Sequence, residues 1–152
     1  RRRLMRRGEI RWVDLDPVRG AESNKRRPGV IVSNDGANTT ASRLGSGVVT
    51  IVPVTSNIDR IHPFQVLLPA RSTGLATDSK AQAEQVRSVA VQRVGARIGD
   101  LTGTQLAELD EVRLDKFHGT VSLPFEAGDN RKVAVKIVDD RGIESLKVIG
   151  LQ

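Results

Sequence analysis

Short apolar runs rich in β-branched residues, separated by polar segments, occupy most of the first ninety positions. Continuous runs lie at 29–33 and 48–54, and further runs lie at 9–15, 64–68 and 80–91. Apolar runs of this length that end at Gly, Pro, Asn or Asp favour strands over helices. The pattern therefore predicts a series of short strands, with one or two in the last run, in a small curled sheet or barrel.

Two polar segments between these runs are predicted to be loops. Residues 18–27 contain glycine, asparagine and three consecutive basic residues, Lys25, Arg26 and Arg27. Residues 34–47, between the two buried strands, are rich in Asn, Asp, Ser, Thr and Gly. The first loop would carry positive charge to the start of the following strand.

One helix is predicted, at residues 103–118. Thr102 and Gln105, three residues apart, have the pattern of a capping box. Gly119 is suited to end the helix, because glycine readily adopts the left-handed conformation found there. One side of this helix is apolar and consists of Leu106, Leu109, Val112 and Phe117.

The chain changes character after Leu123. Two alternating segments, 132–138 and 145–149, flank a turn and indicate a β-hairpin. A hairpin of two strands is marginally stable in water by itself. We therefore expect a main domain at 5–123 and an appended linker with a hairpin, of uncertain origin, at 124–152.

The composition favours a polyanionic partner. The 152 residues suffice for one compact core, and the formal net charge is +6 with a pI near 10.5. Such a charge favours nucleic acid over an acidic protein or an anionic membrane. The sequence has only three Phe and one Trp as aromatic residues, which argues against a surface that stacks successive bases.

The cysteine count and the apolar run lengths bear on location. The chain has no cysteine, which excludes disulfide bonds and thiolate metal sites. No apolar stretch approaches the ~20 residues of a membrane span. We therefore expect a cytoplasmic protein without membrane contact.

An arginine and a threonine at the edges of two buried strands are the most informative chemical feature. Arg27 precedes one apolar run and Thr55 ends the next, so the fold can place them beside one cleft. A guanidinium binds two phosphate oxygens, and a hydroxyl donates to a third. RNA cleavage by the ribose 2′-hydroxyl needs such groups to stabilise the phosphorane. The residues alone leave a second interpretation open, in which Arg27 is a loop cation and Thr55 caps a turn.

Two other candidate sites are less well supported. His62 and His118 could act as general acid and base, although a histidine at a helix C-terminus has a structural explanation. The aspartates at 14–16 and 139–140 lack a Glu or His at ligand spacing, so no metal site is predicted. No glycine-rich phosphate loop or dinucleotide motif is present, so no cofactor is predicted.

Ordered blocks of the sequence resemble the MazF/PemK family of toxin endoribonucleases from bacterial toxin–antitoxin pairs. The blocks are Arg6-Arg7-Gly8-Glu9-Ile10, Val13-Asp14-Leu15-Asp16-Pro17, Arg27-Pro28, Val32-Ser33-Asn34-Asp35, Val52-Pro53-Val54-Thr55, Pro63-Phe64-Gln65-Val66, Gly74-Leu75 and Glu84-Gln85-Val86-Arg87-Ser88. Their shared order is more specific than any one block. It favours the functional interpretation of Arg27 and Thr55.

The resemblance implies a mainly β fold with helices (α+β). The expected architecture is an SH3-like small β-barrel of the CcdB/PemK/MazF type with a C-terminal helix, here followed by the hairpin. The resemblance also implies a homodimer whose interface groove holds single-stranded RNA, and a cognate MazE-like antitoxin. Cleavage would be sequence-specific and metal-free, would leave a 2′,3′-cyclic phosphate and a 5′-hydroxyl, and would inhibit translation and growth.

By motif, the resemblance makes Arg27 and Thr55 the catalytic residues. Arg27 would bind phosphate and act as the acid–base group, and Thr55 would assist. The residues expected to bind RNA are the polar ones in and beside the same blocks: Lys25, Arg26, Ser33, Asn34, Ser56, Asn57, Glu84, Gln85 and Arg87.

Two features depart from the family pattern. PemK-type relatives have an arginine two residues before the carboxylate of the last block, where this chain has Gln82 before Glu84. Glu84 and Arg87 could form a surface ion pair, orient catalytic groups or take part in a dimer contact, and the sequence leaves these alternatives open. The hairpin has no counterpart in the family. The alternative functions are a CcdB-like gyrase-binding toxin and a catalytically silent RNA-binding barrel.

Overall fold

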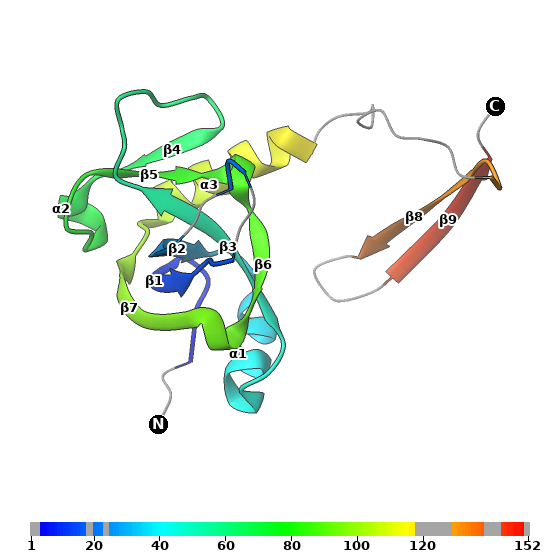
Figure 1. The fold of residues 1–152 in the computed structure, drawn as a ribbon, viewed down its shortest axis with the longest axis horizontal. Helices are drawn as coiled ribbons and strands as arrows, with labels where there is room; N and C mark the ends of the chain where they lie inside the picture. The colour runs from blue at the N-terminus through cyan, green and yellow to red at the C-terminus, as the bar shows by residue number, and fades with distance from the viewer. Residues whose placement is uncertain (1–3, 18–19, 23–24, 118–128, 139–143, 151–152) are drawn as a thin grey trace. The chain divides into compact units, whose positions relative to one another are not determined.

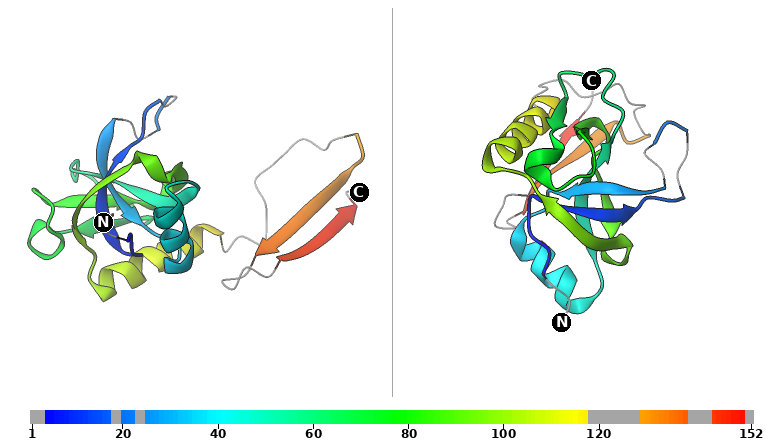
Figure 2. Two further views of the ribbon diagram at one scale, coloured as in Figure 1. Left: turned by 90° about the horizontal axis from the view of Figure 1, so that it is seen from below. Right: turned by 90° about the vertical axis from the view of Figure 1, so that its left-hand side faces the viewer.

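Seven antiparallel strands form one sheet in the order β4-β5-β3-β2-β1-β7, with β6 paired to β3 (Figure 1). The computed structural model describes residues 4–17, 20–22, 25–117, 129–138 and 144–150. The strand bounds are β1 Glu9–Asp14, β2 Arg26–Ile31, β3 Val48–Thr55, β4 Gln65–Leu68, β5 Ser79–Gln82, β6 Arg87–Ala90 and β7 Val94–Asp100. The sheet is strongly curved (Figure 2). The predicted mainly β fold with helices is confirmed.

Helices and short 3-10 turns connect the strands. Their bounds are α1 Asp35–Leu44, α2 Ala70–Thr73, η1 Ala83–Gln85, η2 Val91–Arg93 and α3 Gly103–Phe117. The chain divides into two compact units, Arg1–His118 and Gly119–Gln152, and the sheet and all of these helices lie in the first. None of the helices that the structure describes has the length and apolar character of a membrane span.

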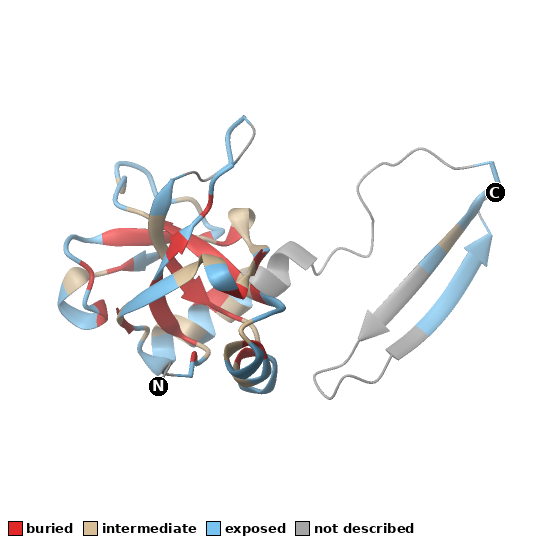
Figure 3. Ribbon diagram, turned by 60° about the horizontal axis from the view of Figure 1, so that its bottom comes forward, coloured by how far each residue is buried: buried red, intermediate tan, exposed pale blue. Residues whose placement is uncertain are grey.

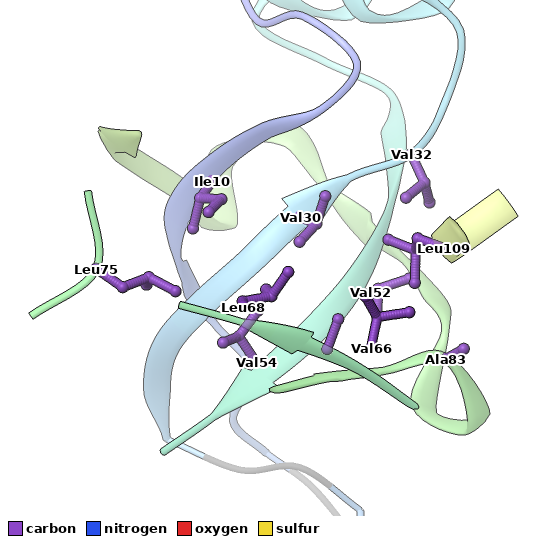
Figure 4. Close-up of a cluster of buried hydrophobic side chains, with 11 residues drawn as sticks. Ile10, Val30, Val32, Val52, Val54, Val66, Leu68, Leu75, Ala83 and Leu109 are labelled. Atoms are coloured by element: carbon purple, nitrogen blue, oxygen red, sulfur yellow. The ribbon is translucent and has the colours of Figure 1, made fainter. Parts of the chain in front are cut away.

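Strands β2 and β3 are buried on both faces, which explains their continuous apolar runs. Val30 and Val52 are paired and face one cluster, whereas Ile31 and Ile51 are paired and face the other. Figure 4 shows the first cluster, and Figure 3 shows the buried residues concentrated on these central strands. The first cluster consists of Ile10, Val30, Val32, Val52, Val54, Val66, Leu68, Leu75, Ala81, Ala83 and Leu109.

The prediction of a loop at 34–47 is wrong, because this segment contains α1. Asn34 caps the helix, and its side chain accepts a hydrogen bond from the Ala37 amide at 2.8 Å. Gly45 ends the helix in the left-handed conformation, with φ 64°. Ala41 is buried against the second apolar cluster. The polar composition hid a short helix that depends on its two caps and on one packed face.

The predicted C-terminal helix is confirmed as α3. The amide of Thr102 donates to the Gln105 side chain at 2.9 Å, and the Gln105 amide donates to the Thr102 hydroxyl at 3.2 Å, as a capping box requires. Leu109 is completely buried. The side chains of residues 113–117, with Gly119 and the rest of 118–128, lie outside the described residues.

Two predictions near the strand boundaries are corrected. Strand β2 begins at Arg26, three residues before the predicted start, because Arg26 and Arg27 pair with Asp14 and Val13 of β1. Strand β7 was not predicted. Its sequence carries glycines at 95 and 99, which weaken the strand pattern.

The second unit contains the predicted hairpin. Strands β8 Lys132–Val138 and β9 Glu144–Gly150 pair in an antiparallel ladder from Lys132 opposite Gly150 to Val138 opposite Glu144. The predicted turn at 139–142 lies outside the described residues. Three apolar side chains of β9 are exposed: Leu146, Val148 and Ile149.

A variant that ends at Leu123 is expected to fold like the full chain. Both apolar clusters and the seven-stranded sheet consist of residues before 118, so the truncation removes no contact within them. The midpoint of thermal unfolding should change by less than about 5 °C, which corresponds to roughly 1 kcal/mol in a domain of this size. A variant that fails to fold would show that the hairpin is an integral part of the domain.

Candidate active site

Strand pairing brings Arg27 and Thr55 to the same end of the sheet. Strands β2 and β3 are antiparallel, with Gly29 opposite Pro53. Arg27 and Thr55 each lie two residues beyond this pair, at the same end of the two strands. The two residues predicted to share a cleft therefore lie at the same edge of the β2–β3 pair.

These residues line a cleft of about 580 Å³ at the open end of the first apolar cluster. Val54, Leu75 and Ile98 contribute its apolar lining, which is continuous with the core. The cleft is lined by Trp12, Arg27, Pro28, Val54, Thr55, Ser56, Gly74, Leu75, Ala76, Thr77, Ser79, Arg97 and Ile98. Its volume lies in the range typical of small-ligand sites.

Two arginines, Arg27 and Arg97, line this cleft, and further basic side chains lie at the start of β2. The Arg26 guanidinium lies 5.4 Å from the centre of the Trp12 ring, in a cation–π arrangement. Arg97, which also lines the cleft, forms ion pairs with Asp100 and, at 3.9 Å, with Glu9. Lys25 is exposed one residue before β2. The cleft therefore presents positive charge toward an anionic ligand.

Thr55 takes part in a turn and also lines the cleft. Its hydroxyl oxygen accepts a hydrogen bond from the Asn57 amide at 3.3 Å, and the Asn57 side chain accepts from the Asp59 amide at 3.2 Å. Because a hydroxyl can accept and donate simultaneously, this turn leaves the Thr55 proton for another acceptor. The capping interpretation and the functional interpretation of Thr55 are thus compatible.

Ser33 and Asn34 have structural roles away from the cleft. The Ser33 hydroxyl donates to the Asn38 side chain at 2.5 Å and accepts from the Thr50 amide at 3.1 Å. Asn34 is the N-cap of α1. The structure does not bring these two residues together with Arg27, although all were expected to contact RNA.

Glu84, Gln85 and Arg87 bind other parts of the fold. Glu84 accepts a hydrogen bond from the Gln65 side chain at 2.7 Å. Gln85 donates to the Ala21 carbonyl at 3.2 Å. Arg87 donates to the Leu15 carbonyl at 2.6 Å and lies 3.7 Å from the Glu22 carboxylate. Gln85 and Arg87 thus bind the segment that connects β1 and β2. The ion pair that the structure gives Arg87 is with Glu22 and not with Glu84.

The histidine and aspartate candidates lie away from the cleft wherever the structure describes them. His62 stacks on Phe64 with ring centres 5.0 Å apart, whereas His118 lies outside the described residues, so a histidine pair is not tested. Asp14 and Asp16 accept backbone hydrogen bonds from the amides of Asp16 and Lys25. Within the described residues, no group of three or more acidic or histidine side chains is arranged to hold a metal ion.

The sequence did not predict the part of the cleft that β1 and β7 contribute, which includes Trp12 and Arg97. Arg97 lies in the strand that the sequence pattern did not predict, and Trp12 carries no motif that would mark it as part of a site. Two glycines were available as signals. A Cβ on Gly74 would lie 2.9 Å from the Ile98 carbonyl oxygen, and one on Gly99 would overlap the Thr73 carbonyl. Glycine is required where α2 and β7 approach this closely.

Residues 6–117 match the sequence profile of a family described as the PemK-like, MazF-like toxin of type II toxin–antitoxin systems. The chain belongs to this family. Endoribonuclease MazF9 of Mycobacterium tuberculosis is 62% identical over 108 residues, which are 71% of this chain and 92% of that protein.

Solved structures of the family share the fold. MazF from Deinococcus radiodurans superposes with a TM-score of 0.63 at 24% identity, over 76% of this chain and 97% of that one. A chain of the MazE–MazF structure from the same organism superposes with a TM-score of 0.59 at 22% identity, over 76% and 97% of the two chains. The SH3-like barrel of the CcdB/PemK/MazF type, implied by the resemblance, is therefore confirmed.

Replacing the cap of α1 provides a test of whether Asn34 contacts RNA. Asn34→Ala should lower the free energy of unfolding by about 1 kcal/mol, because the Ala37 amide loses its acceptor, and it should leave the affinity for a single-stranded RNA oligonucleotide unchanged. Denaturant titration and fluorescence anisotropy provide the two measurements, with Thr40→Ala on the exposed side of α1 as the control. A tenfold loss of affinity at unchanged stability would place Asn34 on the RNA instead.

Proposed function

We propose that this protein is an endoribonuclease toxin that cleaves single-stranded RNA sequence-specifically and without a metal ion. The observation that carries the proposal is that Arg27 and Thr55, at the same end of β2 and β3, line one cleft. Family membership supports it, as does 62% identity to a protein named as an endoribonuclease. No feature of the described site favours a gyrase-binding toxin or a silent RNA-binding barrel.

The proposed reaction is a transesterification within the RNA. The ribose 2′-oxygen attacks the adjacent phosphorus and loses its proton, the bond from phosphorus to the 5′-oxygen breaks, and that oxygen gains a proton. The products are a 2′,3′-cyclic phosphate and a 5′-hydroxyl. The nucleophile belongs to the substrate, so the protein has to position the phosphate, transfer protons and stabilise charge.

Arg27 and Thr55 are assigned to these tasks. The Arg27 guanidinium is suited to hold two phosphate oxygens and to stabilise the charge that develops on the phosphorane. The Thr55 hydroxyl, oriented by the Asn57 amide, is suited to donate to a third oxygen. Proton transfer by Arg27 is the role that the family resemblance implies. Lys25, Arg26, Ser56 and Asn57 would then contact the neighbouring nucleotides.

The proposed function also implies an oligomeric state, an inhibitory partner and a division of the chain. We infer a homodimer that acts in the cytoplasm and is inhibited by a MazE-like antitoxin, supported by the similarity to the chain in the MazE–MazF structure. Residues 5–123 would form the toxin domain and 124–152 an appended segment. Cleavage of cellular RNA would then inhibit translation and growth.

The purified protein is expected to cleave single-stranded RNA in the presence of EDTA. The cleaved fragments should carry a cyclic phosphate and a 5′-hydroxyl, as mass spectrometry of the fragment ends would show. Loss of cleavage in EDTA, with recovery on addition of a divalent ion, would contradict the metal-free mechanism. Inhibition of gyrase without RNA cleavage would support the CcdB-like alternative.

Arg27→Ala should lower kcat/KM by at least about 100-fold, because it removes the group that binds and stabilises the phosphorane. Thr55→Val should have a smaller effect, and Thr55→Ser should retain activity. Arg43→Ala, which removes an exposed arginine from the last turn of α1, is the matched charge control. Full activity of Arg27→Ala in a folded dimer would contradict the assignment.

A further inference from the structure

Lys80 occupies an unexpected position beside the proposed active site. It is directly opposite Thr55 on β5, on the side of Thr55 away from Arg27. Its exposed fraction is 8%, and its ammonium donates to the Arg60 carbonyl at 2.5 Å. Within the described part of the chain, no carboxylate forms an ion pair with it.

A buried ammonium without a carboxylate opposes folding, since its hydration is lost and only partly replaced. An apolar residue at this position would fill the same space without that cost. The charge of Lys80 is therefore not explained by the stability of the sheet. The contact that it does make is with the β3–β4 loop, residues 56–64.

Side chains hold this loop at several points along its length. At its start, the Thr55 hydroxyl accepts from the Asn57 amide. Near its end, the Gln65 side chain accepts from the His62 amide at 3.1 Å, and Glu84 in turn accepts from the Gln65 side chain. Lys80 binds the middle of the loop. The loop therefore has a defined shape although it contains no helix or strand.

The outer side of the same loop is available to a ligand. Ser56 lines the cleft and Asn57 is exposed beside it, so the loop leaves the cleft at the position of Thr55. Further along, Ile61 and Phe64 are 42% and 40% exposed. An RNA strand whose phosphate lies at Arg27 and Thr55 would thus pass its adjoining nucleotide along this loop.

We propose that Lys80 is a positioning residue, which fixes the β3–β4 loop so that the loop selects the nucleotide beside the scissile phosphate. The inference rests on the proposed endoribonuclease function. A loop that is already ordered loses little conformational entropy when RNA binds, and it discriminates better between nucleotides than a mobile loop does. The ammonium acts through the Arg60 carbonyl and does not touch the substrate.

The test compares two RNA oligonucleotides in the full-length protein. One is the preferred substrate, and the other differs by one nucleotide beside the scissile bond and is cleaved more slowly by the wild type. Lys80→Met should lower kcat/KM for the preferred RNA by about tenfold, the effect of one lost charge-assisted hydrogen bond, and should reduce the ratio between the two substrates toward one. Lys80→Arg, which keeps a charged donor, should retain the ratio.

Lys132→Met is the matched control, because it removes an exposed lysine from β8 in the other unit. This variant should change neither kcat/KM for the preferred RNA nor the ratio between the two substrates. An equal loss on both RNAs with Lys80→Met would mean that Lys80 acts on the common phosphate or on the fold, and would overturn the inference, as would an unchanged ratio. A wild type that cleaves neither RNA would refute the proposed function itself.

A loop variant keeps the inference testable if Lys80→Met does not fold. Asp59→Gly/Arg60→Gly loosens the same loop at exposed positions and leaves Lys80 in place. It should reproduce the reduced ratio, with little change in the slower substrate. Wild-type selectivity in this variant would show that the ordered loop does not choose the nucleotide, and would overturn the role assigned to Lys80.

Discussion

The pairing of β2 with β3 is the constraint on which the rest of the structure depends. Val30 faces Val52 and Ile31 faces Ile51, so the pair supplies side chains to both apolar clusters. A shift of one residue in this register would move each set to the wrong face. The same pairing brings Arg27 and Thr55 to one end of the two strands, where both line the cleft. The interaction that specifies the core therefore also specifies the chemistry at the end of the strands.

The sequence predicted the parts of the fold in which local pattern and burial agree. The strands around Val30, Val52 and Val66, the capping box of α3 and the hairpin all have this property. Helix α1 was missed, because its stability comes from Asn34, Gly45 and one packed face, while most of its residues are polar. Strand β7 was missed, because its glycines serve close contacts, Gly99 with the end of α2 and Gly95 with Trp12 of β1, which cannot be seen in a linear pattern.

The candidate site, like the fold, could be predicted from the sequence only in part. Arg27 and Thr55 could be predicted because the strand edges and the family motifs indicate the same residues. The polar residues in the neighbouring motifs could not be divided into RNA-binding and structural residues. A side chain that caps a helix or holds a loop has the same chemistry as one that binds RNA. Ser33, Gln85 and Arg87 turn out to bind backbone or side chains of the protein. Lys80 gave no signal, because its position opposite Thr55 depends on the pairing of β3 with β5.

The close approach of α2 and β7 has a consequence for the evolution of the cleft. Gly74 and Gly99 each meet the backbone of the facing segment, and residues of both segments line the cleft. A side chain at either position would force the backbone of these two segments apart and would change the shape of the cleft that both of them line. The cleft therefore restricts what evolution can change at these two positions, although neither residue has a side chain that could touch a substrate.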